Sequence, residues 1–118
     1  MSNFSVGFRT SGVVQILDLH GELDAHTAAE LEAAIQKCQK DNRVHILING
    51  ANLMYISSAG LGVFMAYIEE VRESGGDIKI AGLQPKVYNV FDLLGFPMLF
   101  DIMDSEDDAV SKFSASAE

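Results

Sequence analysis

Apolar and polar positions along the chain change their period several times, and these changes mark alternating strands and helices. Phe4–Phe8 alternates apolar residues with polar or small ones, Ser11-Gly12 is typical of a turn, and Val13–His20 is a second β-rich run. These features predict an N-terminal hairpin whose second strand ends at Gly21.

Apolar residues at spacings of three and four predict the helices. An amphipathic pattern runs from Thr27 to Lys40, and another runs from Ser58 to Ser74, where Gly75-Gly76 supplies a left-handed stop. A third helix opens at Pro85 and ends at Gly95, because proline favours the first turn and glycine the end. The segment Ser105–Phe113 predicts a fourth, with acidic residues in its first turn.

The intervening segments predict the remaining strands. Val44–Ile48 is short and nearly continuously apolar, as expected of a central strand, and a loop is expected over Asn49–Ser57. Further strands are expected at Asp77–Ala81 and Met98–Ile102, and a frayed tail at Ser114–Glu118. The pattern therefore predicts one α/β domain over residues 1–118, with a mixed sheet of four to five strands and about four helices.

Composition narrows the class of protein. The 118 residues are 48% hydrophobic and 21% charged, which suits one domain with a single core. Eight basic against 17 acidic residues give a net charge of −9, which opposes binding to nucleic acid or to an anionic membrane surface. The longest apolar run, Gly60–Ile68, is far shorter than the roughly 20 residues of a membrane span. A single cysteine, Cys38, and a start without a signal-peptide pattern predict a cytoplasmic protein.

Two hydroxyls stand at the predicted start of the second long helix. Ser57 and Ser58 lie in the segment Met54–Gly62, which joins the central strand to that helix. A helix N-terminus offers unpaired N–H groups and a partial positive charge, so it can hold a phosphate attached to its own serine. The alternative is that one of the two serines simply caps the helix.

Catalytic motifs are incomplete in this segment. A nucleophile elbow needs glycine two residues before the serine, where this chain has Ile56 before Ser58. Gly60-Leu61-Gly62 begins like a dinucleotide fingerprint, but Met65 stands in place of its third glycine. We therefore expect no catalytic residue and no cofactor, and a small nucleotide-binding or hydrolytic protein is the weakest alternative.

Metal binding is also not expected. The candidate ligands lack the i, i+3 or i, i+4 spacing of a helical zinc site. These residues are His20, His26, His45 and Cys38.

Two motifs taken together resemble the STAS domain of bacterial anti-sigma factor antagonists. The first is Ile-Ser-Ser-Ala-Gly-Leu-Gly-Val at Ile56–Val63, and the second is Gly-Glu-Leu-Asp-Ala-His-Thr at Gly21–Thr27. The resemblance extends over most of the chain and implies a single STAS domain. It also implies a non-enzymatic partner-switching protein.

The resemblance implies that the unphosphorylated protein binds an anti-sigma factor serine kinase of the histidine-kinase-like ATPase type. The kinase phosphorylates a serine at the start of the second helix, and a metal-dependent protein phosphatase reverses this. By motif position the acceptor is Ser58. The family often has Asp-Ser-Ser-Gly or Asp-Ser-Thr-Gly at this point. This chain has Ser57 in the place of the aspartate, so Ser57 is the alternative acceptor.

The resemblance also implies a partner-binding surface, and it leaves one functional alternative. The implied partner-binding residues are Asp24, Ser57, Ser58, Ala59, Gly60 and Leu61. The alternative is a constitutive STAS adaptor that controls a phosphatase, a secretion process or a signalling complex without phosphorylation.

Overall fold

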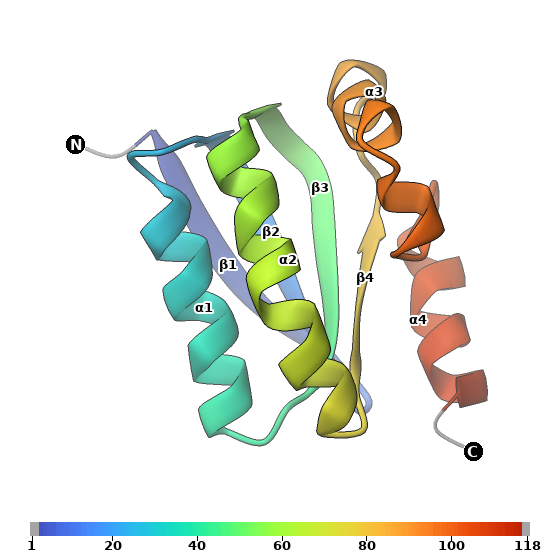
Figure 1. Cartoon of the computed structure of the whole chain (residues 1–118). Coiled ribbons are helices and arrows are strands. Elements are labelled where there is room, and N and C mark those ends of the chain that lie inside the picture. Colours follow the sequence, from blue (N-terminus) through green and yellow to red (C-terminus); the bar gives the residue numbers. More distant parts are fainter. Residues whose placement is uncertain (1–2, 117–118) are drawn as a thin grey trace.

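Five strands form one mixed sheet in which neighbouring strands follow the order of the chain, β1-β2-β3-β4-β5 (Figure 1). The computed structural model describes residues 3–116. The strands are β1 Phe4–Ser11, β2 Val14–Leu23, β3 His45–Ile56, β4 Asp77–Ala81 and β5 Ile102–Met103. β1 and β2 are antiparallel and every other pair is parallel, which confirms the mixed sheet and the central place of β3.

Within residues 3–116, four α-helices and one short 3₁₀ turn connect and cover the strands. They are α1 Ala28–Lys40, α2 Ser58–Glu73, α3 Pro85–Leu93, the turn η1 Phe96–Met98, and α4 Glu106–Ser116. The helices predicted from Thr27, Ser58 and Pro85 are confirmed. The fourth helix continues to Ser116, past the predicted end and into the segment expected to fray, and residues 117–118 lie outside the described part.

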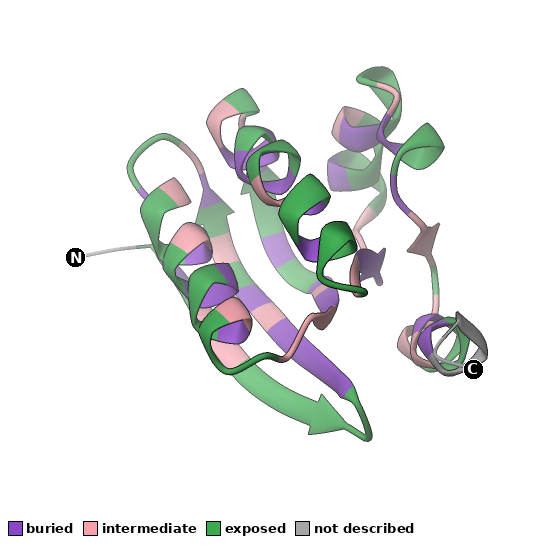
Figure 2. Cartoon of the chain, turned by 60° about the horizontal axis from the view of Figure 1, so that its bottom comes forward, coloured by how far each residue is buried: buried purple, intermediate pink, exposed green. Residues whose placement is uncertain are grey.

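The core has two layers, one on each face of the sheet. The larger layer packs α1, α2 and α3 against strand residues such as Leu19 and Ile48, and the inward sides of these helices are buried in Figure 2. The smaller layer seats Phe113 of α4 against Ile16 and Leu47 on the opposite face. The sheet is therefore covered on both faces where β3 and β4 lie, and this fixes the ends of these strands.

The second strand continues past Gly21 to Leu23, so the prediction that Gly21 ends it is wrong. Gly21 has φ 99° and lies against the backbone of Asn3, whose carbonyl oxygen would be 1.7 Å from an added Cβ. The pairing between β2 and β3 shifts between Gly21 and Glu22. The strand accommodates the glycine as an irregularity and continues.

The central strand is also longer than predicted, because the segment expected to be a loop, Asn49–Ser57, is strand as far as Ile56. β4 pairs with β3 only up to Asn49, whereas β2 accompanies it to the end, with Leu23 opposite Ile56. The outer half of β3 therefore has one neighbouring strand, and its polar residues face water.

The strand predicted at Met98–Ile102 is wrong in most of its length. Residues 96–98 form η1, and β5 holds only Ile102 and Met103. Phe96 and Phe100 stack with ring centroids 5.2 Å apart, a contact typical of residues four apart in a helical turn. The N–H of Phe100 also donates to the carbonyl oxygen of Phe96 at 2.8 Å, so the segment forms a turn and the strand begins only at Ile102.

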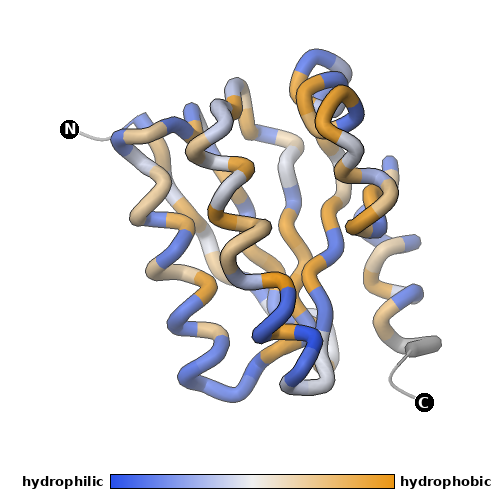
Figure 3. Tube along the Cα trace, in the orientation of Figure 1, coloured by the Kyte–Doolittle hydropathy of each residue, from blue (hydrophilic) through white to orange (hydrophobic). Residues whose placement is uncertain are grey.

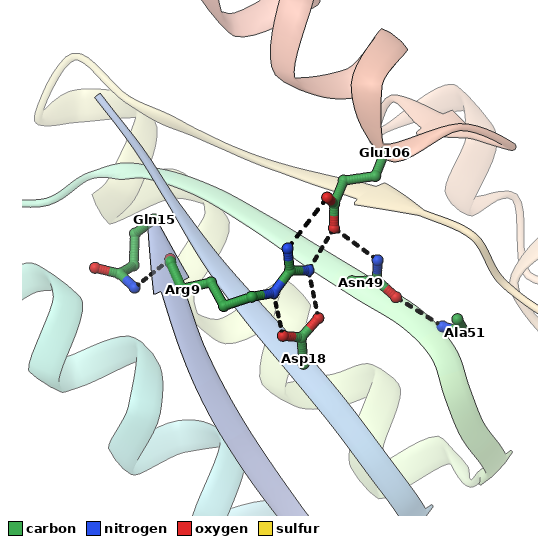
Figure 4. Close-up of polar contacts among 6 residues, drawn as sticks. All are labelled: Arg9, Gln15, Asp18, Asn49, Ala51 and Glu106. Carbon is green, nitrogen blue, oxygen red and sulfur yellow. Dashed lines mark hydrogen bonds and ion pairs between the residues drawn. The ribbon is translucent and has the colours of Figure 1, made fainter. Parts of the chain in front are cut away.

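A charged network anchors the start of α4 to the first hairpin (Figure 4). The Arg9 guanidinium donates to both carboxylate oxygens of Asp18, at 2.6 and 2.7 Å, and also to Glu106. Asn49 donates to the same Glu106 carboxylate at 2.8 Å. The hydrogen bonds from Arg9 hold the pKa of Asp18 and of Glu106 below their ordinary values, and the pKa of Arg9 is raised in turn.

Cys38 is buried in the main core beside Ile35 and Leu31 of the same helix. Burial raises the pKa of its thiol to about 11. Among the described residues, no helix combines the length and apolar character needed to cross a membrane.

Candidate functional site

Ser58 is the first residue of α2 and lies exposed at the carboxyl end of the central strand. Ser57 precedes it in an extended conformation, with φ −104° and ψ 175°, and occupies the N-cap position. The first turn of α2 carries no acidic residue. The positive end of the helix dipole is therefore not offset by a carboxylate of that turn.

The Ser57 hydroxyl does not serve as a side-chain cap. It makes no cap hydrogen bond, and its Oγ is buried without a hydrogen-bond partner among the described residues. The carbonyl oxygen of Ser57 instead accepts the N–H of Leu61 at 3.1 Å. Ser57 therefore gives the amides of the first turn no side-chain acceptor, and such amides are the groups by which a helix start can bind an anion.

Gly60 and Leu61 hold the start of α2 against the sheet. An added Cβ at Gly60 would lie 2.8 Å from Leu23 Cγ and 3.0 Å from Ile56 Cγ1, so only glycine fits without displacement. Leu61 is 3% exposed and belongs to the main core. Both residues therefore seat the helix, while Ser58 faces solvent and Ala59 is half-buried.

Asp24 lies in a tightly hydrogen-bonded loop between β2 and α1. Its Oδ1 accepts the backbone N–H of His26 at 2.9 Å and that of Thr27 at 3.2 Å. The Thr27 hydroxyl accepts the N–H of Asp24 and donates to the Glu22 carbonyl oxygen at 2.8 Å. These bonds fix the loop and leave the half-buried Asp24 side chain at its surface.

One backbone hydrogen bond brings this loop to the start of α2. The N–H of Ser57 donates to the carbonyl oxygen of Leu23 at 2.9 Å, and Asp24 is the next residue along. The structure therefore places the two sequence motifs side by side at one end of the sheet. Of the predicted binding residues, Asp24, Ser58 and Ala59 reach the surface with their side chains, whereas Gly60 and Leu61 lie beneath it.

The sequence reasoning missed apolar side chains that are exposed beside these motifs. Met54 and Tyr55, at the end of β3, are 47% and 51% exposed, and Met65 on α2 is 46% exposed. Gly62 is also exposed, and an added Cβ there would meet no atom within 4 Å. The spacing of Ser58, Gly62 and Met65 by four and three residues was the signal, since it puts them on one helical face.

We call Asp24, Ser58, Gly62 and Met65 the switch surface. Its α2 part is weakly polar: the first turns of this helix are pale to orange in Figure 3, whereas its last turns alternate blue with orange. A partner that docks here would contact a small-residue helical face edged by one carboxylate. In the part of the chain that the structure describes, no group of three or more His, Cys, Asp or Glu is placed to hold a metal ion.

The clearest charge interactions lie away from this surface. Lys79 is buried between Asp77 and Asp101, and its Nζ donates to their carboxylates at 2.9 and 2.8 Å. This cluster lies toward the start of β4, at the end of the sheet away from Ser58. These pairs raise the pKa of Lys79 against the effect of its burial, and Lys79 lowers the pKa of Asp101. At Ser58 the arrangement instead offers a hydroxyl, helix-end amides and apolar surface, which suit phosphoryl acceptance and docking.

Comparison with known proteins identifies the family of the fold. The STAS domain model matches residues 7–109. The anti-sigma F factor antagonist of Paenibacillus polymyxa is 31% identical over 103 residues, which are 84% of this chain and 86% of that protein.

Solved structures show the same fold. An anti-sigma factor antagonist from Mycobacterium paratuberculosis superposes with a TM-score of 0.86 at 22% identity, over 94% of each chain. The Bacillus cell fate determinant SpoIIAA in its phosphorylated form gives a TM-score of 0.68 at 21% identity, over 92% of this chain and 97% of that one.

Proposed function

Since this chain belongs to the STAS domain family and is by homology an anti-sigma factor antagonist, we propose that it is a partner switch controlled by phosphorylation of Ser58. In its unphosphorylated form it binds an anti-sigma factor serine kinase of the histidine-kinase-like ATPase type through the switch surface. Phosphorylation ends this binding, and a metal-dependent phosphatase restores it. The protein is the ligand and substrate of these enzymes, acts in the cytoplasm and catalyses no reaction itself.

The observation that carries the proposal is the contrast between the two serines. Ser58 is exposed at the first position of α2, whereas the Oγ of Ser57 is buried. A kinase active site can reach the Ser58 hydroxyl without unfolding the helix start. Reaching the Ser57 hydroxyl would require that residue to turn outward and disturb the hydrogen bond from its N–H to Leu23.

The chemical step is transfer of the γ-phosphoryl group of ATP. Ser58 Oγ forms a bond to the γ-phosphorus, the bond from that phosphorus to the bridging oxygen breaks, and ADP leaves. The hydroxyl proton passes to a base of the kinase. Hydrolysis by the phosphatase returns the hydroxyl and releases inorganic phosphate.

The helix end explains why the fold tolerates the product. A phosphoserine carries about −1.5 to −2 charges, and the amides and dipole at the start of α2 favour an anion there. The fold therefore loses little stability on phosphorylation.

The partner responds differently. The same charge enters a surface that includes Gly62 and Met65, and in the complex it would have to lose water against the partner. Binding weakens for this reason, although the shape of the protein hardly changes.

The proposal is tested with the purified protein, the anti-sigma factor kinase and ATP, followed by peptide mass spectrometry. We expect phosphate on Ser58 in the wild-type protein and in Ser57→Ala, and none in Ser58→Ala. Ser58→Ala and Ser57→Ala are matched controls, because each removes one hydroxyl and both should fold. Phosphate on Ser57 alone, or on neither serine, would overturn the site.

Affinity measurements separate the switch from a constitutive adaptor. We expect Ser58→Asp to bind the anti-sigma factor at least about tenfold more weakly than Ser58→Ala, because one charge is introduced into a desolvated interface. Equal affinities would instead favour an adaptor that works without phosphorylation.

A further inference from the structure

We propose that the outer edge of β1 is a homodimer interface, at which β1 of one copy pairs antiparallel with β1 of a second copy. The edge lies on the far side of the sheet from α3 and α4 (Figure 1). It is separate from the switch surface, so the inference does not depend on the proposed phosphorylation.

The two edges of the sheet differ in how they are protected. β5 has two residues, and α4 follows it after a short connection. β1 has eight residues and pairs with β2 without a register shift. Proteins that remain monomeric usually blunt long edge strands with lysine, proline or a bulge, and the sequence of β1 contains neither lysine nor proline.

The pairing of β1 with β2 shows which of its backbone groups point outward. The N–H of Glu22 donates to the carbonyl oxygen of Asn3, and Ser11 and Val14 close the hairpin across a two-residue turn. The odd-numbered residues therefore form the hydrogen-bonded pairs with β2. Among the even-numbered residues, Val6, Phe8 and Thr10 direct their N–H and C=O groups toward the open edge.

The side chains beside this edge form an apolar groove against α1. Phe8 is 45% exposed, and with Val6 it lines a hollow of about 340 Å³ whose other wall includes Ala33 of α1. The only charged residue of β1, Arg9, is held by Asp18 and Glu106 on the other face. The edge therefore presents backbone hydrogen-bonding groups and apolar side chains without a repelling charge of its own.

Charge complementarity favours a second copy as the occupant. Glu30 and Lys37 also line the groove, seven residues apart on α1, with opposite charges. A two-fold axis through Gly7 places Val6 opposite Phe8 of the second copy and Glu30 near its Lys37. The Lys37 side chain is 62% exposed, so it can reach across while Asp41 stays beside it.

Net charge sets the conditions for observing the dimer. Two copies each carry −9, so they repel at low salt, and this repulsion is screened beyond about 8 Å at 0.15 M ionic strength. Sedimentation velocity of the purified full chain at this ionic strength should show the mass of two chains. A protein that stays monomeric at concentrations up to about 1 mM overturns the proposal.

Paired variants locate the interface. Phe8→Lys should raise the dimer dissociation constant at least about tenfold, since it puts a charge on the edge. Val13→Lys is the matched control, because Val13 is 54% exposed in the hairpin turn and off the edge, and it should leave the dimer unchanged. A dimer that Phe8→Lys does not weaken uses another surface and contradicts the proposal.

A charge swap tests the two-fold arrangement. Glu30→Lys and Lys37→Glu should each weaken the dimer, and the double variant should restore it. Failure of the double variant rejects this orientation. Hydrogen exchange gives an independent readout: the amides of Val6 and Phe8 should be protected in the dimer, and protection that appears only when another protein is added would assign the edge to a foreign strand instead.

Discussion

The backbone N–H of Ser57 donates a 2.9 Å hydrogen bond to the carbonyl oxygen of Leu23. This bond links the residue before α2 to the residue before Asp24, so the helix start and the β2–α1 loop are held at a fixed separation. A partner that contacts both meets a prearranged surface and does not have to order it on binding. Substitutions in the β2–α1 loop and in the start of α2 can therefore be compared for their separate effects on stability and on partner binding.

Substitution of Asp24 distinguishes its loop contacts from its charge. Asp24→Asn keeps the oxygen that accepts the N–H groups of His26 and Thr27, so we expect the free energy of unfolding to change by less than about 0.5 kcal/mol. Asp24→Ala removes that acceptor and should cost about 1 kcal/mol. Urea denaturation measures both. Equal losses for the two variants would show that the carboxylate charge, and not the loop geometry, matters for stability.

The two glycines of the α2 start should respond in opposite directions. Gly60→Ala forces a Cβ against Leu23 and Ile56 and should destabilise the protein by about 1–3 kcal/mol. Gly62→Ala meets open space in a helix and should stabilise it by up to about 1 kcal/mol. Thermal unfolding of the two variants compares them directly. A stabilising Gly60→Ala would mean that α2 does not sit as closely on the sheet as described.

The Arg9 network predicts a specific acid sensitivity. The pKa values of Asp18 and Glu106 are lowered in the folded protein, mainly by hydrogen bonds from Arg9. These carboxylates therefore stabilise the fold at neutral pH, and their contribution is lost as the pH falls through their folded-state pKa values. Arg9→Gln should lower stability at pH 7 by roughly 1 kcal/mol, since water screens the half-exposed Arg9, and by much less at pH 2.

Lys86→Gln is the control for that experiment. It changes the net charge equally at an exposed position in α3, outside the network. Urea denaturation at both pH values should show little difference between this variant and the wild type. If Arg9→Gln and Lys86→Gln shift stability by the same amount at pH 7, the effect belongs to overall charge, and the anchoring of α4 by Arg9 is contradicted.

Cys38 should react slowly with thiol reagents. Its side chain is 2% exposed and the pKa of its thiol is raised to about 11, chiefly by burial, so little thiolate exists at pH 8. We expect the rate with an aromatic disulfide reagent to rise at least about a hundredfold when the protein is unfolded in urea. A rapid reaction of the native protein would show that α1 opens readily at this position.

Much of the fold followed from local patterns. The strand Asp77–Ala81 has the predicted bounds, and α2 begins at the predicted residue, because an apolar run, a glycine stop and a serine start are local signals. The outer half of β3 was missed, since its strand character depends on pairing with β2 alone. The same holds for Gly21, whose place within β2 is set by contact with Asn3.

The candidate site was likewise predicted in part from local motifs, and the rest depends on contacts between segments. Ser58 and Asp24 were identified by motif, and the structure adds that their two segments meet through Leu23 and Ser57. The buried state of the Ser57 hydroxyl was not readable from the sequence, because a serine at that position usually caps its helix. The exposure of Met54 and Tyr55 was not predicted, because the segment that holds them was expected to be a loop and not the end of β3.

The order of strands in the sheet has a consequence for synthesis. Since the spatial order is the chain order, each strand that leaves the ribosome can join the edge left by the strand before it. The bond between Arg9 and Glu106 spans 97 positions and forms only when α4 has emerged. The contact between the first hairpin and α4 is thus among the last to form, and α4 packs onto a sheet that is already assembled.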